Sequence, residues 1–523
     1  MSDSDKDNVR VSIASESRDV LSHEQLDAVI SVNGHDYKLD SKNVDEAMEF
    51  ALESQGLSLT PQQDAKLRRK IDLYLVPFFI LLYAIQYMDK ISNSFASVMG
   101  LQASLGMTGS QYSWLGSAFY LGYLVFELPA SYLLQKYSVS KVTSIFILLW
   151  GIIVCVMPAA NLQGFMALRV ILGMLESSIT PAMVILTTQW YKKEEHYLRT
   201  AIWLSACSVG SILGYSFAYG LYIHGGNWSI ASWKVVYIVI GLCNVLLAIA
   251  FYFHIPDSPA SAWFLTKEEK LMAVERIRAN NQGFGNKTFK RDQLKECLLD
   301  WKIWLMFAFG VLDEVPNGGL TNFTSILLKT DFKYTTKKSL LMNIPLAVVS
   351  FVVTVGIACL YSFKIIKSRF WCSVIALGLA IIGSCMLAFS DSKNVGLGGL
   401  FVMQASDIGM ICIISIFQSN VAGHTKKMVG NAMFLIAYCA GNVIGPQTFK
   451  SSESPDYHTA KGTIVGCYCG AIVILIILFF SYYLENKKRE KAREALGEKY
   501  VKVENIEFAD LTDKQNPEFR YAY

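Results

Sequence analysis

Charged residues are scarce in this chain of 523 residues. Asp, Glu, Lys and Arg together make up 17% of the sequence, whereas 53% of it is hydrophobic. A soluble protein of this length would carry about a quarter charged residues. The composition therefore excludes an ordinary soluble domain and indicates a polytopic membrane protein. The net charge of +4 is small and scattered among loops, so it gives no support for nucleic-acid binding.

Signatures of catalysis and of metal binding are also missing. The chain has no G-x-x-x-x-G-K-[ST] loop for a nucleotide and neither H-E-x-x-H nor G-x-S-x-G. Its 11 cysteines lie mostly inside apolar runs and show no paired zinc spacing. No ladder of arginines suggests a voltage sensor. We therefore predict no enzymatic activity, no cofactor and no metal.

Apolar runs of about 20 residues are abundant, and each is long enough to cross about 30 Å of hydrocarbon as a helix. We expect twelve spans, near 72–92, 112–134, 142–160, 164–190, 200–222, 235–255, 302–327, 340–361, 370–390, 397–420, 429–448 and 463–484.

A long charged loop divides these spans into two equal sets. The predicted organisation is a tail at 1–69, a six-helix bundle at 70–255, a central loop at 256–300, a second six-helix bundle at 301–485 and a tail at 486–523. The first tail holds no apolar region of signal-peptide type, so the first span is expected to act as an uncleaved signal. Equal halves around a linker are typical of duplicated bundles with a substrate site between them.

Lysines in the short loops predict the orientation in the membrane. The loops after spans two, four, eight and ten carry Lys136 and Lys141, Lys192 and Lys193, Lys364 and Lys367, and Lys426 and Lys427. This places both tails and the central loop in the cytoplasm. The loop after span seven, with four lysines between 329 and 338, argues in the other direction. We expect the plasma membrane or the endoplasmic reticulum, since the final residues EFRYAY hold no retention signal.

Two spans carry opposite charges where a helix would cross the bilayer. Arg169 and Glu176 are seven residues apart in the fourth span and so share one helix face. Asp89 and Lys90 are adjacent in the first span. Intramembrane charges are costly and mark functional sites by default. The alternatives are an ion pair that only locks the bundle for Arg169 and Glu176, and a pair at the membrane edge for Asp89 and Lys90.

Further candidates come from polar and flexible positions in other spans. In the seventh span, Pro316, Gly318 and Gly319 free backbone groups and are expected to break the helix, or else only to kink it. The residues expected to hydrogen-bond a substrate are Asn317, Asn322 and Gln418. Glu127 is interpreted as a packing or gating acid, and Gly441, Gly445 and Pro446 as close-packing and hinge positions.

Several stretches resemble a known family. The order R-x-x-x-G-x-x-E…P…WY…E…R in 169–199 resembles the fourth helix of the anion:cation symporter family of the major facilitator superfamily. The stretches 255–280, 315–323, 419–427 and 438–462 are similar to its allantoate permease branch, which comprises fungal carriers of allantoate, nicotinate, pantothenate, biotin and related anions. The resemblance spans about 70–485 and implies an all-α membrane protein of about 12 helices in two six-helix halves.

The resemblance also implies roles for individual residues. Tyr87-Met88-Asp89-Lys90 matches the family pattern Y-L-D-R. By this match Lys90 and Arg169 would contact a substrate carboxylate, and Asp89 and Glu176 would take up protons. Lysine in place of arginine keeps the charge but loses the planar fork.

The expected function is thus symport of protons with a small organic anion, by alternating access in a monomer. The anion would be a carboxylate or a vitamin-like compound, with a link to the thiamine pathway. Two alternatives stay open at this point: a nutrient sensor that keeps the carrier fold but does not transport, and a proton antiporter.

Overall fold

The computed structural model describes residues 29–32, 35–38, 59–225, 229–278, 290–362, 368–496, 511–516 and 519–522. In the N-terminal tail, β1 (Val29–Val32) and β2 (His35–Lys38) form an antiparallel pair in which Val29 faces Lys38. All other regular structure among the described residues is helical.

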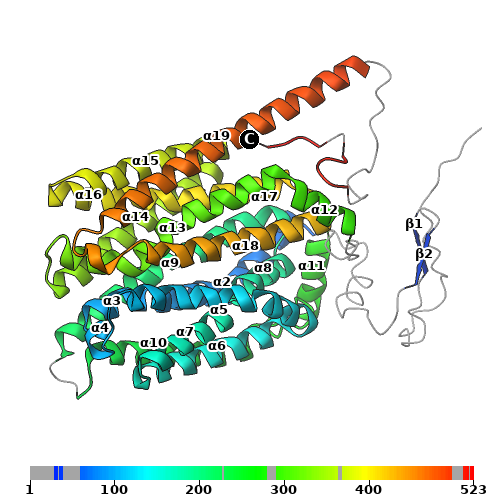
Figure 1. Ribbon diagram of the computed structural model, residues 1–523. Helices are drawn as coiled ribbons and strands as arrows, with labels where there is room; N and C mark the ends of the chain where they lie inside the picture. Colours follow the sequence, from blue (N-terminus) through cyan, green and yellow to red (C-terminus); the bar gives the residue numbers. More distant parts are fainter. Residues whose placement is uncertain are drawn as a thin grey trace, which may run out of the picture.

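The helices form two halves, which lie one above the other in Figure 1. The N half contains α2 (Pro61–Lys90), α3 (Ser92–Val98), α4 (Leu101–Ser104), α5 (Gln111–Lys136), α6 (Val139–Val156), η3 (Met157–Ala159), α7 (Leu162–Glu176), α8 (Ile179–Trp190), α9 (Lys193–Ile223) and α10 (Ser232–His254). The C half contains α13 (Trp301–Thr330), α14 (Thr336–Ser362), α15 (Arg369–Phe389), α16 (Lys393–Met403), η5 (Gln404–Ser406), α17 (Asp407–Asn420), α18 (His424–Gln447), η6 (Ser451–Glu453) and α19 (His458–Leu496).

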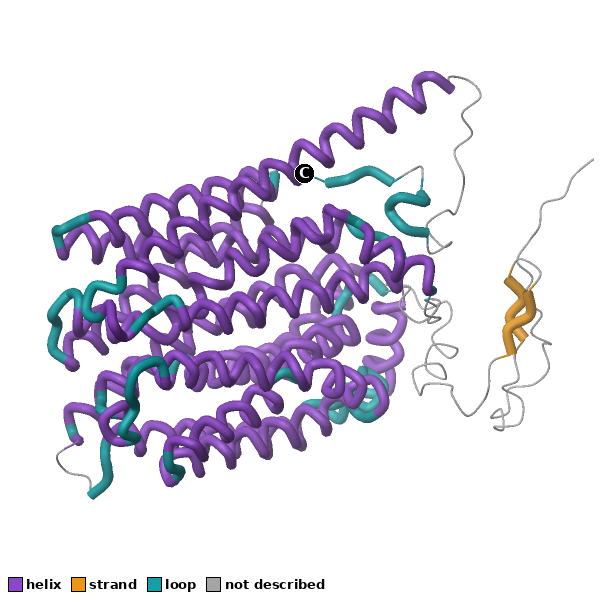
Figure 2. The backbone as a smooth tube through the Cα atoms, in the orientation of Figure 1, coloured by secondary structure: helices purple, strands orange, loops and turns teal. Residues whose placement is uncertain are grey.

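Among the described residues, ten helical segments are long and apolar enough to cross a membrane. Two of them are joined pairs, α7 with α8 and α16 with α17. The helices α5 and α13 are 26 and 30 residues long and complete the twelve predicted positions. These two helices are not among the ten because polar and charged residues lower their apolar character; α5 packs on α7 and α13 on α18. The loops gather at the two ends of the bundle (Figure 2).

Interruptions fall beside the buried charges of the N half. The helix α2 ends at Lys90, close to the predicted end of the first span at 92, and the chain continues through Ile91 into α3. Asp89 is fully buried and Lys90 donates to Tyr438 of the C half, so both side chains face the interior of the bundle. In the fourth span α7 ends at Glu176, and α8 begins after two serines.

The expected break in the seventh span is absent. The helix α13 runs unbroken from Trp301 to Thr330 with Pro316 inside it. The glycines instead allow close packing: a Cβ at Gly318 would lie 2.6 Å from the Cα of Asn442, and one at Gly445 would lie 2.3 Å from the carbonyl oxygen of Val315. Tertiary contact with α18 thus keeps the helix continuous despite its proline.

The two halves are joined at one end of the bundle, which we call the closed end. There Lys329 and Thr336 of the C half donate hydrogen bonds to the carbonyl oxygen of Val98 in the N half. Ser113 and Ser117 donate to carbonyl oxygens of Phe449 and Val443. The opposite end, where α2 begins, is called the open end.

Helices of the central loop cap the open end of each half separately. The helix α11 (Lys267–Arg278) lies against the N half, where Arg276 pairs with Asp64 at 2.9 Å. The helix α12 (Arg291–Leu299) lies against the C half, where Glu296 pairs with Lys426 at 2.9 Å. Each half thus carries its own part of the central loop.

The C-terminal tail is bound to the C half. Asp513 and Asp300 both pair with the buried ammonium group of Lys426, at 2.7 and 2.9 Å. The Asn420 side chain donates to the carbonyl oxygen of Ala522 and accepts from its N–H. The described residues of the tail are therefore packed on the protein.

Candidate functional site

The ammonium group of Lys90 lies where the two halves meet. It donates a hydrogen bond of 2.6 Å to the hydroxyl of Tyr438, which belongs to α18 of the C half. It also lies 5.8, 5.3 and 5.2 Å from the ring centres of Tyr87, Tyr120 and Tyr438. Aromatic faces attract a cation but do not neutralise it. Among the described residues no carboxylate forms an ion pair with Lys90.

Two carboxyl groups lie beside this lysine, deep in the N half. Asp89 is fully buried and accepts a hydrogen bond of 2.8 Å from the indole N–H of Trp150 in α6. Glu176 is 1% exposed and interacts electrostatically with Asp89 and Lys90. One oxygen of Glu176 has no hydrogen-bond partner within the described part of the chain. The two helix interruptions thus bring the predicted acids together.

Arg169 is buried among neutral partners. One terminal nitrogen donates to Ser92 Oγ at 3.0 Å, to Asn93 Oδ1 and to the hydroxyl of Tyr237 at 2.7 Å. The guanidinium group is in electrostatic range of Asp89 and Glu176, yet it forms no ion pair with a described carboxylate. Its Nε has no hydrogen-bond partner among the described residues. The expectation that Arg169 and Glu176 only lock the bundle as an ion pair is therefore wrong.

The C half faces this cluster with acids and amides. Glu314 accepts hydrogen bonds from the side-chain amides of Asn317 at 2.6 Å and Asn442 at 2.8 Å. Asp407, at the start of α17, accepts from Ser350 at 2.8 Å, and Ser350 contacts Ser208 of the N half at 3.3 Å. Among the described residues, this side of the site therefore offers hydrogen-bonding groups and no Lys or Arg side chain.

The remaining predicted residues lie apart from the centre. Asn322 is buried near the closed end and donates to the carbonyl oxygen of Gly318 in its own helix. Gln418 is exposed at the end of α17 and bonds Asn431, so we do not include it in the site. Glu127 is buried on α5 with one oxygen unpartnered among the described residues. Gly441 packs against Glu314, and Pro446 is buried in α18.

Several residues of the site escaped the sequence analysis. Trp150, Tyr120, Tyr438, Asn93 and Tyr237 contact the predicted charges but lie in apolar runs, where aromatic residues are common. Tyr87 could have been found, because it lies three residues before Lys90 and so shares its helix face. The others come from different helices, and only tertiary structure brings them to the cluster.

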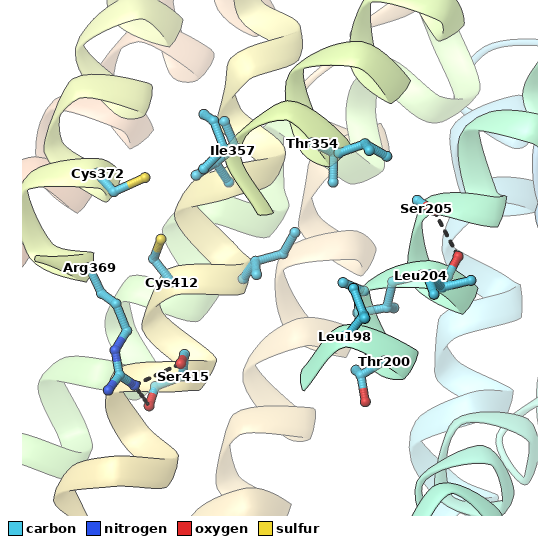
Figure 3. A pocket seen from close by; sticks show the side chains of 15 residues that line it. Leu198, Thr200, Leu204, Ser205, Thr354, Ile357, Arg369, Cys372, Cys412 and Ser415 are labelled. Carbon is cyan, nitrogen blue, oxygen red and sulfur yellow. Dashed lines mark hydrogen bonds between the residues drawn. The ribbon is translucent and has the colours of Figure 1, made fainter. Parts of the chain in front are cut away.

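A cavity opens between the halves toward the open end (Figure 3). It holds about 930 Å³ of empty space, including the part open to solvent, and is lined by α9, α14, α15 and α17. Its lining is almost entirely apolar. Arg369 lies at its edge and donates to Ser415 and Ser419. The cavity lies between α9 of the N half and α14, α15 and α17 of the C half. Within the described residues, no group of three His, Cys, Asp or Glu side chains could hold a metal ion.

The arrangement of the helices is found in known membrane proteins. The fold is similar to that of a bacterial homologue of the human lysosomal transporter Spinster in an inward-facing and occupied conformation, with a TM-score of 0.58 and 14% identity, covering 79% of this chain and 96% of that one. Likeness at this identity shows the fold alone.

Sequence comparison specifies the family. Residues 79–446 match the model of the Major Facilitator Superfamily. The chain is 42% identical over 532 residues to the allantoate permease of Saccharomyces cerevisiae, covering 99% of this chain and 97% of that one. It is 29% identical over 466 residues to the thiamine pathway transporter of the same yeast, covering 88% and 86%. The chain belongs to the major facilitator superfamily. It is a multi-pass membrane transporter and, like that family, a carrier without enzymatic activity.

Proposed function

We propose that this transporter moves a small organic anion together with protons by alternating access, in a monomer. Lys90 and Arg169 bind the anion, Asp89 and Glu176 take up protons, and Asn317 adds a hydrogen bond from the C half. The cavity at the open end supports an assignment of this structure to the conformation that is open toward the cytoplasm.

The observation that carries this proposal is the pair of enclosed cations that form no ion pair with any carboxylate among the described residues. A charge in an apolar interior is costly unless a counter-charge compensates it. Lys90 and Arg169 are surrounded by hydroxyl groups, an amide and aromatic rings. Once Asp89 and Glu176 are protonated, an anionic substrate would supply the charge that balances the two cations, which gives the site its preference. The relative named allantoate permease supports a carboxylate as that anion.

Coupling to protons follows from the acids beside the cations. Asp89 and Glu176 repel each other when both are charged, so a proton on either relieves that repulsion. An anion that engages the basic residues weakens their stabilisation of the carboxylates and favours proton uptake. Anion and proton then enter together, and no covalent step is needed.

Charges at the open end support the orientation. The helix α2 begins there with basic residues, and the long charged loop and α19 end there too. Basic segments favour the cytoplasmic side, so both termini are proposed to be cytoplasmic. The membrane is the plasma membrane or that of the endoplasmic reticulum.

The test is uptake of radiolabelled carboxylates, allantoate included, into proteoliposomes with and without an inward proton gradient. Accumulation of one anion driven by the gradient is the expected result. Accumulation driven by an outward gradient would replace symport with antiport. Binding without accumulation would indicate a sensor.

A further inference from the structure

The short helix α3 lies between the buried charges and the contacts that join the halves at the closed end. Its first three residues, Ser92, Asn93 and Ser94, are polar, and each is 2% exposed or less. With seven residues, α3 is too short to be stable by itself, so its position depends on the contacts it makes.

Toward the site, α3 holds the guanidinium group of Arg169. Asn93 Oδ1 accepts hydrogen bonds from Arg169 and, at 2.9 Å, from the hydroxyl of Tyr237. Ser92 Oγ accepts from Arg169 and donates weakly to Asp89 at 3.5 Å. The buried charges and the start of α3 are therefore one hydrogen-bonded network.

Toward the C half, the same segment closes the bundle. The hydroxyl of Tyr112 bridges the carbonyl oxygen of Asn93 at 3.1 Å and that of Asn322 at 2.8 Å. Ser94 donates to Ser325 at 2.9 Å. Asn93 is thus connected through its side chain to Arg169 and through its backbone to the other half.

We propose that Asn93 is a positioning residue that couples Arg169 to the closed end. While Arg169 bonds Asn93, α3 is held in register with Tyr112 and the C half, and the closed end stays shut. When the guanidinium group turns to another partner, α3 loses that support and the contacts across the halves weaken. Under the proposed function the other partner is the substrate anion, but the link between Arg169 and the closed end exists without it.

The experiment measures opening of the closed end with no substrate present. In purified protein whose native cysteines are replaced, Val98→Cys reports opening through its rate of labelling by a maleimide, because Val98 is 5% exposed there. Arg169→Ala and Asn93→Ala are each expected to speed labelling roughly fivefold or more, the equivalent of one net hydrogen bond. The double variant is expected to be no faster than the faster single variant.

Ser94→Ala is the matched control, since it removes a contact across the halves without touching Arg169. Its effect is expected to multiply with that of Arg169→Ala. A second reporter, Thr200→Cys at the open-end cavity, should label no faster in any variant, whereas general unfolding would speed labelling at both positions.

The proposal is overturned if Arg169→Ala leaves labelling unchanged, or if its effect multiplies with that of Asn93→Ala. Should Asn93→Ala fail to fold, Tyr112→Phe tests the same link, because it removes the bridging hydroxyl but keeps the ring packed 5.1 Å from Phe323. Failure of anion transport would contradict the proposed function and leave this result unaffected.

Discussion

The two halves have comparable helices but face each other with different chemistry. At the middle of the N half, Lys90 and Arg169 lie beside Asp89 and Glu176. The C half presents Glu314 there, tied to two asparagines. The buried or partly buried basic residues described in the C half lie near helix ends instead, and they include Lys302, Arg369, Lys426 and Lys461.

The backbone differs in the same way. In the N half, helices end at Lys90 and Glu176, so the charged side chains stand at interruptions. In the C half, α13 passes the site unbroken and is packed closely on α18 through glycines. Interrupted helices can change their local arrangement more easily than continuous ones. Under the proposed function, the N half binds the anion and takes up protons, while the C half supplies a rigid face of continuous, closely packed helices.

The largest effect is expected at Arg169. Arg169→Ala should reduce anion affinity about 100-fold, because charge-assisted hydrogen bonds contribute about 1.5–3 kcal/mol and an anion would then enter an uncompensated cavity. Equilibrium binding of the transported carboxylate measures it. Arg369→Ala removes a base of the C half and should change affinity less than about twofold. Unchanged affinity in Arg169→Ala would remove this residue from the site.

Carboxyl groups of the two halves should differ in proton coupling. Glu176→Gln is expected to abolish dependence on the proton gradient but keep exchange of anion across the membrane. Glu314→Gln retains a side chain that can accept from Asn317, and it should keep the dependence. Gradient-driven uptake and counterflow, both measured in proteoliposomes, distinguish proton coupling from exchange in each variant. Loss of gradient dependence in Glu314→Gln alone would reverse the assignment of roles.

The packing of α13 against α18 in the C half leaves no room for one additional methyl group. Gly445→Ala would place a Cβ against backbone atoms of α13 and should lower the free energy of unfolding by about 1–3 kcal/mol, as overpacking does. Gly466→Ala on α19 meets nothing within 4 Å and is the control. Thermal unfolding in detergent compares them. Equal stability of both variants would mean that α13 and α18 can separate without cost.

A smaller effect is expected where the halves touch Lys90. Tyr438→Phe keeps the ring but removes the hydroxyl that accepts from Lys90. It should raise the KM for the anion about fivefold, the value of one hydrogen bond of about 1 kcal/mol. Tyr438→Ala, which also removes the ring, should raise it further. If both variants transport like the wild type, the C half takes no part in holding Lys90.

The smallest effect concerns the tail on the C half. Burial alone would raise the pKa of Asp300, but the ammonium groups of Lys426 and Lys514 hold it below the ordinary value of 3.8. A carboxyl group whose pKa is lowered in the folded state stabilises that state at pH values above its ordinary pKa. This stabilisation is lost as the pH falls through the pKa of the folded state. Lys514, which pairs with Asp300 at 3.2 Å, belongs to the tail, so docking of residues 511–516 should weaken as the pH falls below about 3.8 and Asp300 loses its charge. Hydrogen exchange of the tail measures this, and Asp300→Asn should remove the Asp300-dependent part of the change.

Much of the fold could be predicted, because bilayer thickness imposes a length on every apolar run. Helix ends near the site could not. Asp89 and Lys90 fall at the interruption between α2 and α3, and Pro316 fails to break α13 because α18 packs against it. Gln418 was chosen for its polarity alone, and polarity does not indicate which helix face meets the interior.

The sequence alone therefore determined the membrane class, the twelve helical positions and the family, since these depend on composition, run length and local motifs. It also identified the charges of the N half, because a charge in an apolar run stands out. Tertiary structure decided which partners these charges have. It placed three tyrosines from different helices around Lys90, and it connected Arg169 to the closed end through Asn93. Those contacts join residues far apart in the chain, and helix packing alone brings them together.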